Sequence, residues 1–324
     1  MQSAIVIREH GNSAVLKLEE IIVGHPGAGE ILISHSAIGV HFHDIYVRSG
    51  LYKTLSLPGI PGVEATGIIE EIGKGVTGFR PGDKIGYITS AYGAYASHRL
   101  LDQNFAIKLP NFLSDDIIAT NFTRAMTVQM LIEYVTKLTP EHTILVTAAT
   151  GGVGRLLCQW ASSRGVYVIG SVSTPEKAIL AKSYGCKYAL LYKQEDFMPQ
   201  IMDITNQNGV DVVYDSVGSD TFEASLNVLK PCGHLVNFGQ SSGSIDPVHM
   251  STLAKKSLTL SRPIIFHYIA KLELYEKMAH SVFDAFNKKI ITALDPEPYS
   301  LQDASVTHDI LESRRGGGSL LLKP

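Results

Sequence analysis

A glycine-rich segment in the middle of the chain has the residue types and spacing that bind phosphate. An apolar run from Ile144 leads into Ala149-Thr150-Gly151-Gly152-Val153-Gly154, and an amphipathic run begins at Arg155. This order predicts a strand, a tight turn and a helix, and it matches G-x-G-x-x-G with alanine in the first place. Glycines let the backbone approach a diphosphate, and the helix N-terminus offers free N–H groups. The alternative is a glycine turn that only permits tight packing of helix on strand.

The residues about twenty positions beyond the glycine turn indicate which dinucleotide is bound. A cofactor without a 2′-phosphate needs an Asp or Glu there for its ribose hydroxyl, but the chain has Ser171-Val172-Ser173-Thr174. Ser173 or Thr174 can cap the next helix, which brings Lys177 beside the expected 2′-phosphate. We therefore expect NADPH. In the alternative, Lys177 is a solvated helix residue whose charge is partly cancelled by Glu176.

The elements that must position these residues follow two different patterns of secondary structure along the chain. Residues 1 to 125 contain short β-type runs separated by turns, which predict a small antiparallel barrel or sandwich. From 126 to 264, strands alternate with amphipathic helical segments, and such repeated βα units predict a doubly wound parallel sheet. The last segment, 265–324, begins with a helical pattern and ends in a strand-like run. We expect it to return to the first domain.

Composition limits the classes of partner. The 324 residues are 45% hydrophobic and 18% charged, which is enough to bury two cores. The net charge of −3 does not favour nucleic acid or an anionic membrane, so a small-molecule partner is expected. Three widely spaced cysteines do not suggest a disulfide framework, and neither a charged leader nor an apolar run of membrane length is recognisable. We expect a cytoplasmic protein.

Six segments together resemble one known family. They are residues 39–52, 61–67, the AATGGVG turn at 148–154, 213–218, 235–243 and 311–315. The chain resembles the zinc-free quinone oxidoreductases related to zeta-crystallin, in the medium-chain dehydrogenase/reductase superfamily. The resemblance implies an α/β fold with a Rossmann NADPH-binding domain (126–264) and a GroES-like β-barrel catalytic domain (1–125 and 265–324). It also implies a cofactor cleft between the domains and a homodimer.

The resemblance assigns roles to individual positions. Along the cofactor, it places Gly151, Gly152, Val153 and Gly154 at the diphosphate, Ser173, Lys177 and Tyr192 around the 2′-phosphate and adenine, and Ser216, Val217, Phe238 and Ser241 along the remainder. Tyr46, Tyr52 and Thr127 match positions that line the nicotinamide and substrate cleft. For these three residues the alternative is ordinary packing, because tyrosine is common at half-buried positions.

The zinc alcohol dehydrogenases of the same superfamily raise the question of a metal. Around residues 39–44 and 62–64 they are similar to this chain, with zinc ligands at the positions of His41 and Val63. His41 could ligate a metal but Val63 cannot, no cysteine lies near residues 122–125, and catalytic zinc needs three protein ligands. We expect no metal, and we interpret His41, where the family usually has asparagine, as a polar cleft residue. We expect residues 41–43 to form part of a strand, in which side chains two positions apart, such as His41 and His43, can face the same way.

Without a Lewis acid, a substrate that accepts hydride readily is expected, which favours a quinone. Tyr46, Tyr52 or His41 could donate a hydrogen bond to it, and no proton-transfer role is assigned. A second hypothesis keeps NADPH and changes the acceptor to the activated double bond of an enone or enal. A third is a zeta-crystallin-like structural or RNA-binding protein, with which the acidic net charge does not agree.

Two further expectations concern the chain's surface. The apolar run at 257–261 predicts an edge strand that needs covering, which supports a homodimer. If Lys177 does not bind the 2′-phosphate, Arg314 or Arg315 is the alternative.

Overall fold

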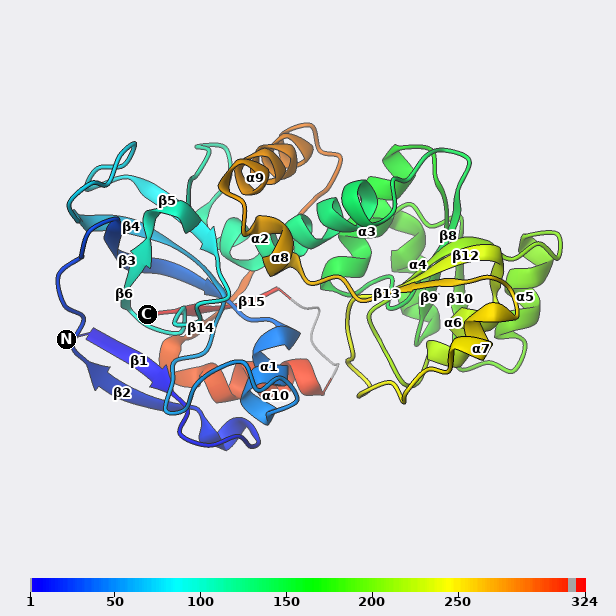
Figure 1. The fold of residues 1–324 in the computed structure, drawn as a ribbon, viewed down its shortest axis with the longest axis horizontal. Coiled ribbons are helices and arrows are strands. Elements are labelled where there is room, and N and C mark those ends of the chain that lie inside the picture. Colours follow the sequence, from blue (N-terminus) through cyan, green and yellow to red (C-terminus); the bar gives the residue numbers. More distant parts are fainter. Residues whose placement is uncertain (1, 314–318) are drawn as a thin grey trace. The chain divides into compact units, whose positions relative to one another are not determined.

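The computed structural model describes residues 2–313 and 319–324, which form two compact units (Figure 1). The first unit consists of Met1–Thr123, Ile269–Phe283 and Ala293–Pro324, and the second of Arg124–Tyr268 and Asp284–Thr292. The sequence predicts 265–324 in the first domain, whereas residues 265–268 and 284–292 group with the second unit. Arg314 and Arg315 lie outside the described residues.

The first unit is built on a mostly antiparallel sheet. Among the described residues its strand order is β14-β15-β3-β4-β5-β7, β6 also pairs with β3, and β14 and β15 run parallel. A separate antiparallel ribbon is formed by β1 and β2. The strands are β1 (Gln2–Val6), β2 (Lys17–Ile21), β3 (Glu30–Gly39), β4 (Glu64–Ile72), β5 (Lys84–Ile88), β6 (His98–Asp102), β7 (Ala106–Lys108), β14 (Glu297–Ser300) and β15 (Leu320–Lys323).

Helices and aliphatic side chains complete the first unit. The helices that contribute to it are α1 (Phe42–Ser49), the first half of α2 (Asp115–Met130), most of α9 (Leu272–Asn287) and α10 (Ala304–Glu312). Alternating strand residues such as Ile31, Ile33 and Ile85 are fully buried in one core. Their burial is the main stabilising contribution to this unit, since apolar area removed from water supplies most of the free energy of folding.

The second unit is a doubly wound parallel sheet, as predicted. Its strand order is β10-β9-β8-β11-β12-β13, with every pair parallel. The strands are β8 (Thr143–Val146), β9 (Tyr167–Val172), β10 (Tyr188–Leu191), β11 (Val210–Asp215), β12 (Leu229–Asn237) and β13 (Thr259–Ser261). The order reverses between β8 and β11, and this switch point is where such sheets bind ligands, at the carboxyl ends of the strands.

Helices connect the strands of this sheet, coloured green to yellow in Figure 1. They are α3 (Gly152–Ser163), α4 (Pro175–Ser183), α5 (Phe197–Ile204), α6 (Phe222–Asn227) and α7 (Met250–Ala254), and α8 (Ile265–Ile269) follows the last strand, β13. A core of buried residues such as Leu145, Ile169 and Val213 lies against the sheet. No helix in the described part of the chain is long and apolar enough to cross a membrane.

One local prediction was wrong. Residues 41–43 were expected on a strand, but β3 ends at Gly39 and α1 begins at Phe42, with His41 as its N-cap. The carboxylate of Asp44, at the third helical position, accepts a hydrogen bond of 2.8 Å from the His41 backbone N–H. This carboxylate satisfies an N–H that the helix itself leaves unpaired, so it favours a helix start over a continued strand.

Candidate functional site

The glycine turn after β8 is shaped by close contacts that only glycine permits. Gly151 is the N-cap of α3, and a Cβ atom at Gly154 would overlap the carbonyl oxygen of Ala148. Ala148 itself adopts a left-handed φ of 47°, which costs an alanine about 1–2 kcal/mol. Strain of this kind concentrates at ligand-binding loops. The loop and the first turn of α3 therefore form a backbone cradle that suits a diphosphate.

The start of α4 fixes where Lys177 lies. Thr174 is the N-cap, its hydroxyl accepts a 3.3 Å hydrogen bond from the Lys177 backbone N–H, and Pro175 occupies the first turn. Of the two caps that the sequence allowed, Thr174 is the one used. Ser173 is exposed directly after β9, and Lys177 is half-buried on the first turn of the helix. Ser173 therefore follows the carboxyl end of β9, and Lys177 lies in the first turn of the helix that comes next. The prediction of a 2′-phosphate site expects the two residues at these places.

Tyr192 approaches the same strand end from β10. Its backbone N–H donates to the carbonyl of Val172, the last residue of β9, at 3.2 Å. The ammonium group of Lys193 lies 5.9 Å from the centre of its ring. The ring is half-buried against the core of the second unit, so its position is set by packing.

A buried carboxylate, which the sequence reading had not singled out, organises the ends of three strands. Asp215 is fully buried, and its Oδ1 accepts hydrogen bonds from the Thr147 hydroxyl, the Val217 N–H and the Thr221 hydroxyl, each at 2.9 Å. Its Oδ2 accepts a 3.3 Å bond from the Asn237 side chain. Thr147, Val217 and Asn237 lie at the ends of β8, β11 and β12, and Thr221 is the N-cap of α6. Asp215 therefore links the carboxyl ends of three strands, where a dinucleotide is expected.

Hydrogen bonds to Asp215 and its neighbours hold the loops that carry the remaining predicted cofactor residues. The Ser216 N–H donates to the Thr147 hydroxyl at 3.0 Å, and the Phe238 N–H donates to the carbonyl of Asp215 at 2.8 Å. The Ser241 N–H reaches the carbonyl of Ser216 at 3.3 Å. Ser216, Val217, Phe238 and Ser241 therefore gather at neighbouring strand ends, as the sequence predicted.

In the first unit, Tyr46 and Tyr52 form an aromatic cluster. Their rings meet edge to face with centres 5.0 Å apart, and the Tyr52 N–H donates to the carbonyl of Tyr46 at 2.9 Å. His43 joins them, 5.8 Å from Tyr52, and its Nε2 lies 3.1 Å from the hydroxyl of Tyr92. Burial, with the nearby His41 as the second cause, lowers the pKa of His43 to about 4. His43 is therefore neutral at neutral pH.

His41 does not belong to this cluster. Its Nε2 contacts Oε2 of Glu64, and the two side chains are 7% and 1% exposed. The other carboxylate oxygen of Glu64 accepts a 2.8 Å hydrogen bond from the Thr123 N–H. Gly39 leaves the space for this contact, because a Cβ atom there would lie 2.8 Å from His41 Nε2 and 3.1 Å from Glu64 Oε2. His41 therefore joins the end of β3 to β4.

A chain of buried hydrogen bonds supports the other side of α1. The Tyr95 hydroxyl lies 3.2 Å from Asp44 Oδ2 and 3.0 Å from His308 Nε2, and His308 Nδ1 lies 3.3 Å from a guanidinium nitrogen of Arg48. Burial, and then the charge of Arg48, lowers the pKa of His308 to about 3. A neutral His308 accepts from Arg48 at Nδ1 and donates from Nε2 to Tyr95, which in turn donates to Asp44.

The residues at the candidate metal positions do not fit a catalytic zinc. His41 contacts Glu64 through its Nε2, and Val63 is a fully buried apolar side chain. Within the residues that the structure describes, no three His, Cys, Asp or Glu side chains gather as a metal would require. Catalytic zinc takes three protein ligands, so we assign no step to a metal.

Thr127 lies on the second half of α2 and is half-buried. It is assigned to the second unit, whereas Tyr46 and Tyr52 belong to the first. Arg124, three residues earlier and therefore on the same side of the helix, is buried and was not singled out in the sequence.

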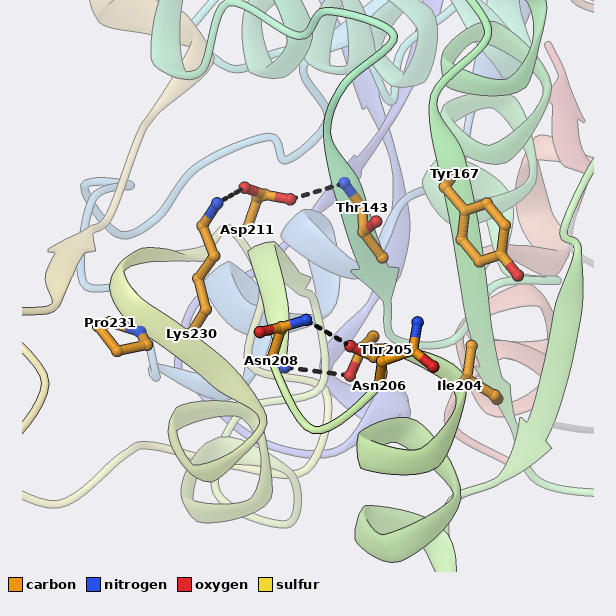
Figure 2. Close-up of a pocket in the computed structure, with 10 residues that line it drawn as sticks. Thr143, Tyr167, Ile204, Thr205, Asn206, Asn208, Asp211, Lys230 and Pro231 are labelled. Atoms are coloured by element: carbon orange, nitrogen blue, oxygen red, sulfur yellow. Dashed lines mark hydrogen bonds and ion pairs between the residues drawn. The ribbon is translucent and has the colours of Figure 1, made fainter.

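A polar pocket lies elsewhere on the second unit (Figure 2). It has a volume of about 590 Å³ and is lined by Thr143, Tyr167 and Asp211 together with Lys230 and the turn after α5. Figure 2 shows Asp211 between Lys230 and the backbone N–H of Thr143. Thr143 and Tyr167 are the first residues of β8 and β9, so this pocket is at the amino end of the sheet, opposite the glycine turn.

Comparisons with known proteins agree with both parts of this architecture. Residues 27–111 match the family described as alcohol dehydrogenase GroES-like domain, and residues 152–286 match the family described as zinc-binding dehydrogenase. The predicted fold class is confirmed by these families and by the solved structure below.

Individual relatives cover the whole chain. Quinone oxidoreductase 1 of Escherichia coli (strain K12) is 38% identical in an alignment 328 residues long that covers 100% of this chain and 100% of that protein. The 2-haloacrylate reductase of a Burkholderia species is 35% identical over 331 residues, covering 100% of this chain and 99% of that protein. The crystal structure of Escherichia coli quinone oxidoreductase complexed with NADPH has a TM-score of 0.96 at 38% identity, and covers 99% of this chain and 100% of that one.

Proposed function

The chain belongs to the quinone oxidoreductases of the medium-chain dehydrogenase/reductase superfamily, and we propose that it reduces quinones with NADPH as its cofactor. The observation that carries this proposal is the full-length alignment with Quinone oxidoreductase 1 of Escherichia coli at 38% identity. The arrangement of the second unit fits the cofactor, because the glycine cradle, the α4 cap and the Asp215 arrangement all lie at the carboxyl ends of one parallel sheet.

The second unit supplies the residues that we assign to NADPH, which when bound provides a hydride from its nicotinamide ring. The backbone of Gly151 to Gly154 receives the diphosphate at the N-terminus of α3. Thr174 caps α4 and so directs Ser173 and Lys177 to the 2′-phosphate, while Tyr192 stacks near the adenine. Asp215 fixes the loops that carry the last four cofactor residues, Ser216, Val217, Phe238 and Ser241.

Tyr46 and Tyr52 are the groups that we assign to the quinone. A quinone oxygen gains negative charge as the ring takes up hydride, and a phenol hydroxyl can donate a hydrogen bond to it. The reduced oxygen is a phenolate, which is stable enough to need no Lewis acid. Thr127 is assigned to the nicotinamide. His41 has its Nε2 against Glu64, so we assign it to holding the start of α1 instead of to proton donation.

A second candidate function is reduction of an activated carbon–carbon double bond by the same cofactor. The observation that favours it is the 35% identity, over the whole chain, to a 2-haloacrylate reductase. Hydride addition to such an alkene leaves a carbanion that must be protonated, and this requires an acid that a quinone does not. The aromatic cluster holds His43 neutral, which makes it a poor proton donor near neutral pH.

Two finer points belong to the same proposal. We propose a homodimer, because β13 is the last strand of the six-stranded sheet in the described part of the chain, and exposed edges are commonly covered by a second copy. Light scattering on the purified chain tests this.

We also propose the cytoplasm as its compartment, where the three free thiols would stay reduced.

The test of the proposed function is the oxidation of NADPH by the purified protein in the presence of an ortho-quinone, a para-quinone or neither. Turnover that depends on the quinone is expected. Binding of NADPH without turnover of either quinone would contradict the proposal.

A further inference from the structure

Arg124 lies against the first residue of α3. It is 7% exposed, and its Nε and Cζ lie 2.8 Å and 3.0 Å from the point that a Cβ atom on Gly152 would occupy. The guanidinium group therefore packs on the bare Cα of Gly152. Any side chain at position 152 would displace this guanidinium group. Gly152 therefore leaves space for Arg124 and also forms part of the backbone cradle.

A second buried cation lies beside the same helical turn. Arg155 is 1% exposed, and its Nη1 donates a 2.6 Å hydrogen bond to the carbonyl of Thr292. Burial and then the positive charge of Arg124 lower the pKa of Arg155 to about 10. Arg124 on Gly152 and Arg155 three residues later in α3 therefore both lie at the N-terminal part of this helix.

At this position the N-terminus of α3 adds a partial positive charge and free backbone N–H groups. The two guanidinium groups and the helix N-terminus each contribute positive charge beside the first turn of α3. A group with two negative charges and several acceptor oxygens is the chemical complement of such a site.

We propose that the guanidinium group of Arg124 binds the diphosphate of the cofactor at the first turn of α3, with Arg155 strengthening the positive potential from within the fold. This proposal rests on the dinucleotide site of the proposed function. It adds a charged side chain to a cradle otherwise made of backbone. Thr127, one helical turn after Arg124, lies on the same side of α2 and was assigned to the nicotinamide, the neighbouring part of the same cofactor.

The diphosphate is common to NADPH and NADH, whereas the 2′-phosphate is not. Loss of Arg124 should therefore weaken both nucleotides by the same factor. Loss of Lys177 should weaken NADPH alone. This difference separates a diphosphate residue from a 2′-phosphate residue without any measurement of turnover.

The experiment is calorimetric titration of the full chain with NADPH and with NADH, for the wild type, Arg124→Gln and Arg164→Gln. Arg164 is a matched control, because it stands at the far end of α3, where it pairs with Glu133 and lies 5.9 Å from the Trp160 ring. We expect Arg124→Gln to raise the Kd of both nucleotides roughly ten- to hundredfold. Arg164→Gln should leave both unchanged. Unchanged affinities in folded Arg124→Gln would overturn the proposal.

Arg124→Lys covers the case in which the glutamine variant does not fold. Lysine keeps the charge but not the guanidinium fork, so both affinities should fall by a smaller and still equal factor. Unchanged affinities there, or a loss for NADPH alone, would overturn the assignment. Wild-type protein that binds both nucleotides but reduces no quinone contradicts only the proposed function, and wild-type protein that binds neither contradicts both.

Discussion

The imidazole of His41 contacts the carboxylate of Glu64, and this contact joins the residue before α1 to the first residue of β4. Removing the imidazole leaves a buried carboxylate oxygen without its partner. We expect His41→Ala to lower the free energy of unfolding by about 1–3 kcal/mol, and His41→Asn to lower it less, because an amide keeps a polar group in this buried position. Chemical denaturation measures both.

The exposed pair of His25 and Glu71 provides the control for this prediction. Its two atoms are 2.9 Å apart, but the His25 side chain is 91% exposed. His25→Ala should leave the unfolding free energy nearly unchanged, because water screens such pairs. Equal losses from the two alanine variants would show that burial of the His41 contact is unimportant.

Selectivity between the two nucleotides should depend on Lys177. We expect Lys177→Ala to lower the ratio of kcat/KM with NADPH to kcat/KM with NADH by roughly ten- to hundredfold, since a charge-assisted contact to the 2′-phosphate is lost. Lys182, in the last turn of the same helix, is the matched control, and Lys182→Ala should not change the ratio. A ratio that stays constant in both variants would mean that another residue binds the 2′-phosphate.

Asp215 should be intolerant of an almost isosteric change. In Asp215→Asn one oxygen becomes an NH₂ group, which would face the Asn237 amide or the donors of Thr147, Val217 and Thr221. Asn237 cannot turn over freely, because its Oδ1 accepts a 2.6 Å bond from Arg262. We expect a loss of about 1–3 kcal/mol in unfolding free energy. The exposed neighbour Asp220 is the control, and a similar loss in Asp220→Asn would contradict this account.

Stability should fall in mild acid. Burial lowers the pKa values of His35 and His308 to about 3 and of His43 to about 4, from an ordinary 6.5. Below pH 6.5 these histidines bind protons in the unfolded chain but stay neutral in the folded chain. The stability that they contribute above pH 6.5 is therefore lost as the pH falls. Two pH units below 6.5, the loss is on the order of 2 kcal/mol for each histidine.

Asp44 acts in the opposite direction. Burial is the main reason that its pKa is raised to about 6 from an ordinary 3.8, so its contribution to stability is present below 3.8 and is lost as the pH rises through 6. Three histidines outweigh one carboxylate, and denaturation midpoints should therefore decrease from pH 7 to pH 4.5. His308→Gln should reduce this pH dependence. A midpoint that does not change over this range would contradict the buried neutral histidines.

The parts of the site that sequence could predict depend on short-range physics. The glycine turn and the Thr174 cap with Pro175 act within a few residues, so their patterns are legible in the chain. His41 and Glu64 are distant in sequence, and Arg48 meets His308 across 260 positions. Such contacts depend on the whole fold. The strand expected at 41–43 was wrong because one carboxylate, Asp44, caps a helix there.

Asp215 and Arg124 show the same limit from another side. Asp215 is the last residue of an ordinary buried strand, and its importance comes from donors that three strand ends bring together. The role that we propose for Arg124 depends on its contact with Gly152, which is distant in sequence and is brought beside it by α3. Neither residue has a local pattern that distinguishes it.

The most direct test of the central claim is the acceptor preference of the purified chain with NADPH. The measurement is kcat/KM for a para-quinone, an ortho-quinone, a short enal and 2-chloroacrylate under identical conditions. We expect at least one quinone to be reduced with the higher kcat/KM, because hydride addition to it needs no proton donor at carbon. Efficient turnover of the alkenes without turnover of either quinone would contradict the account and support the double-bond reductase instead.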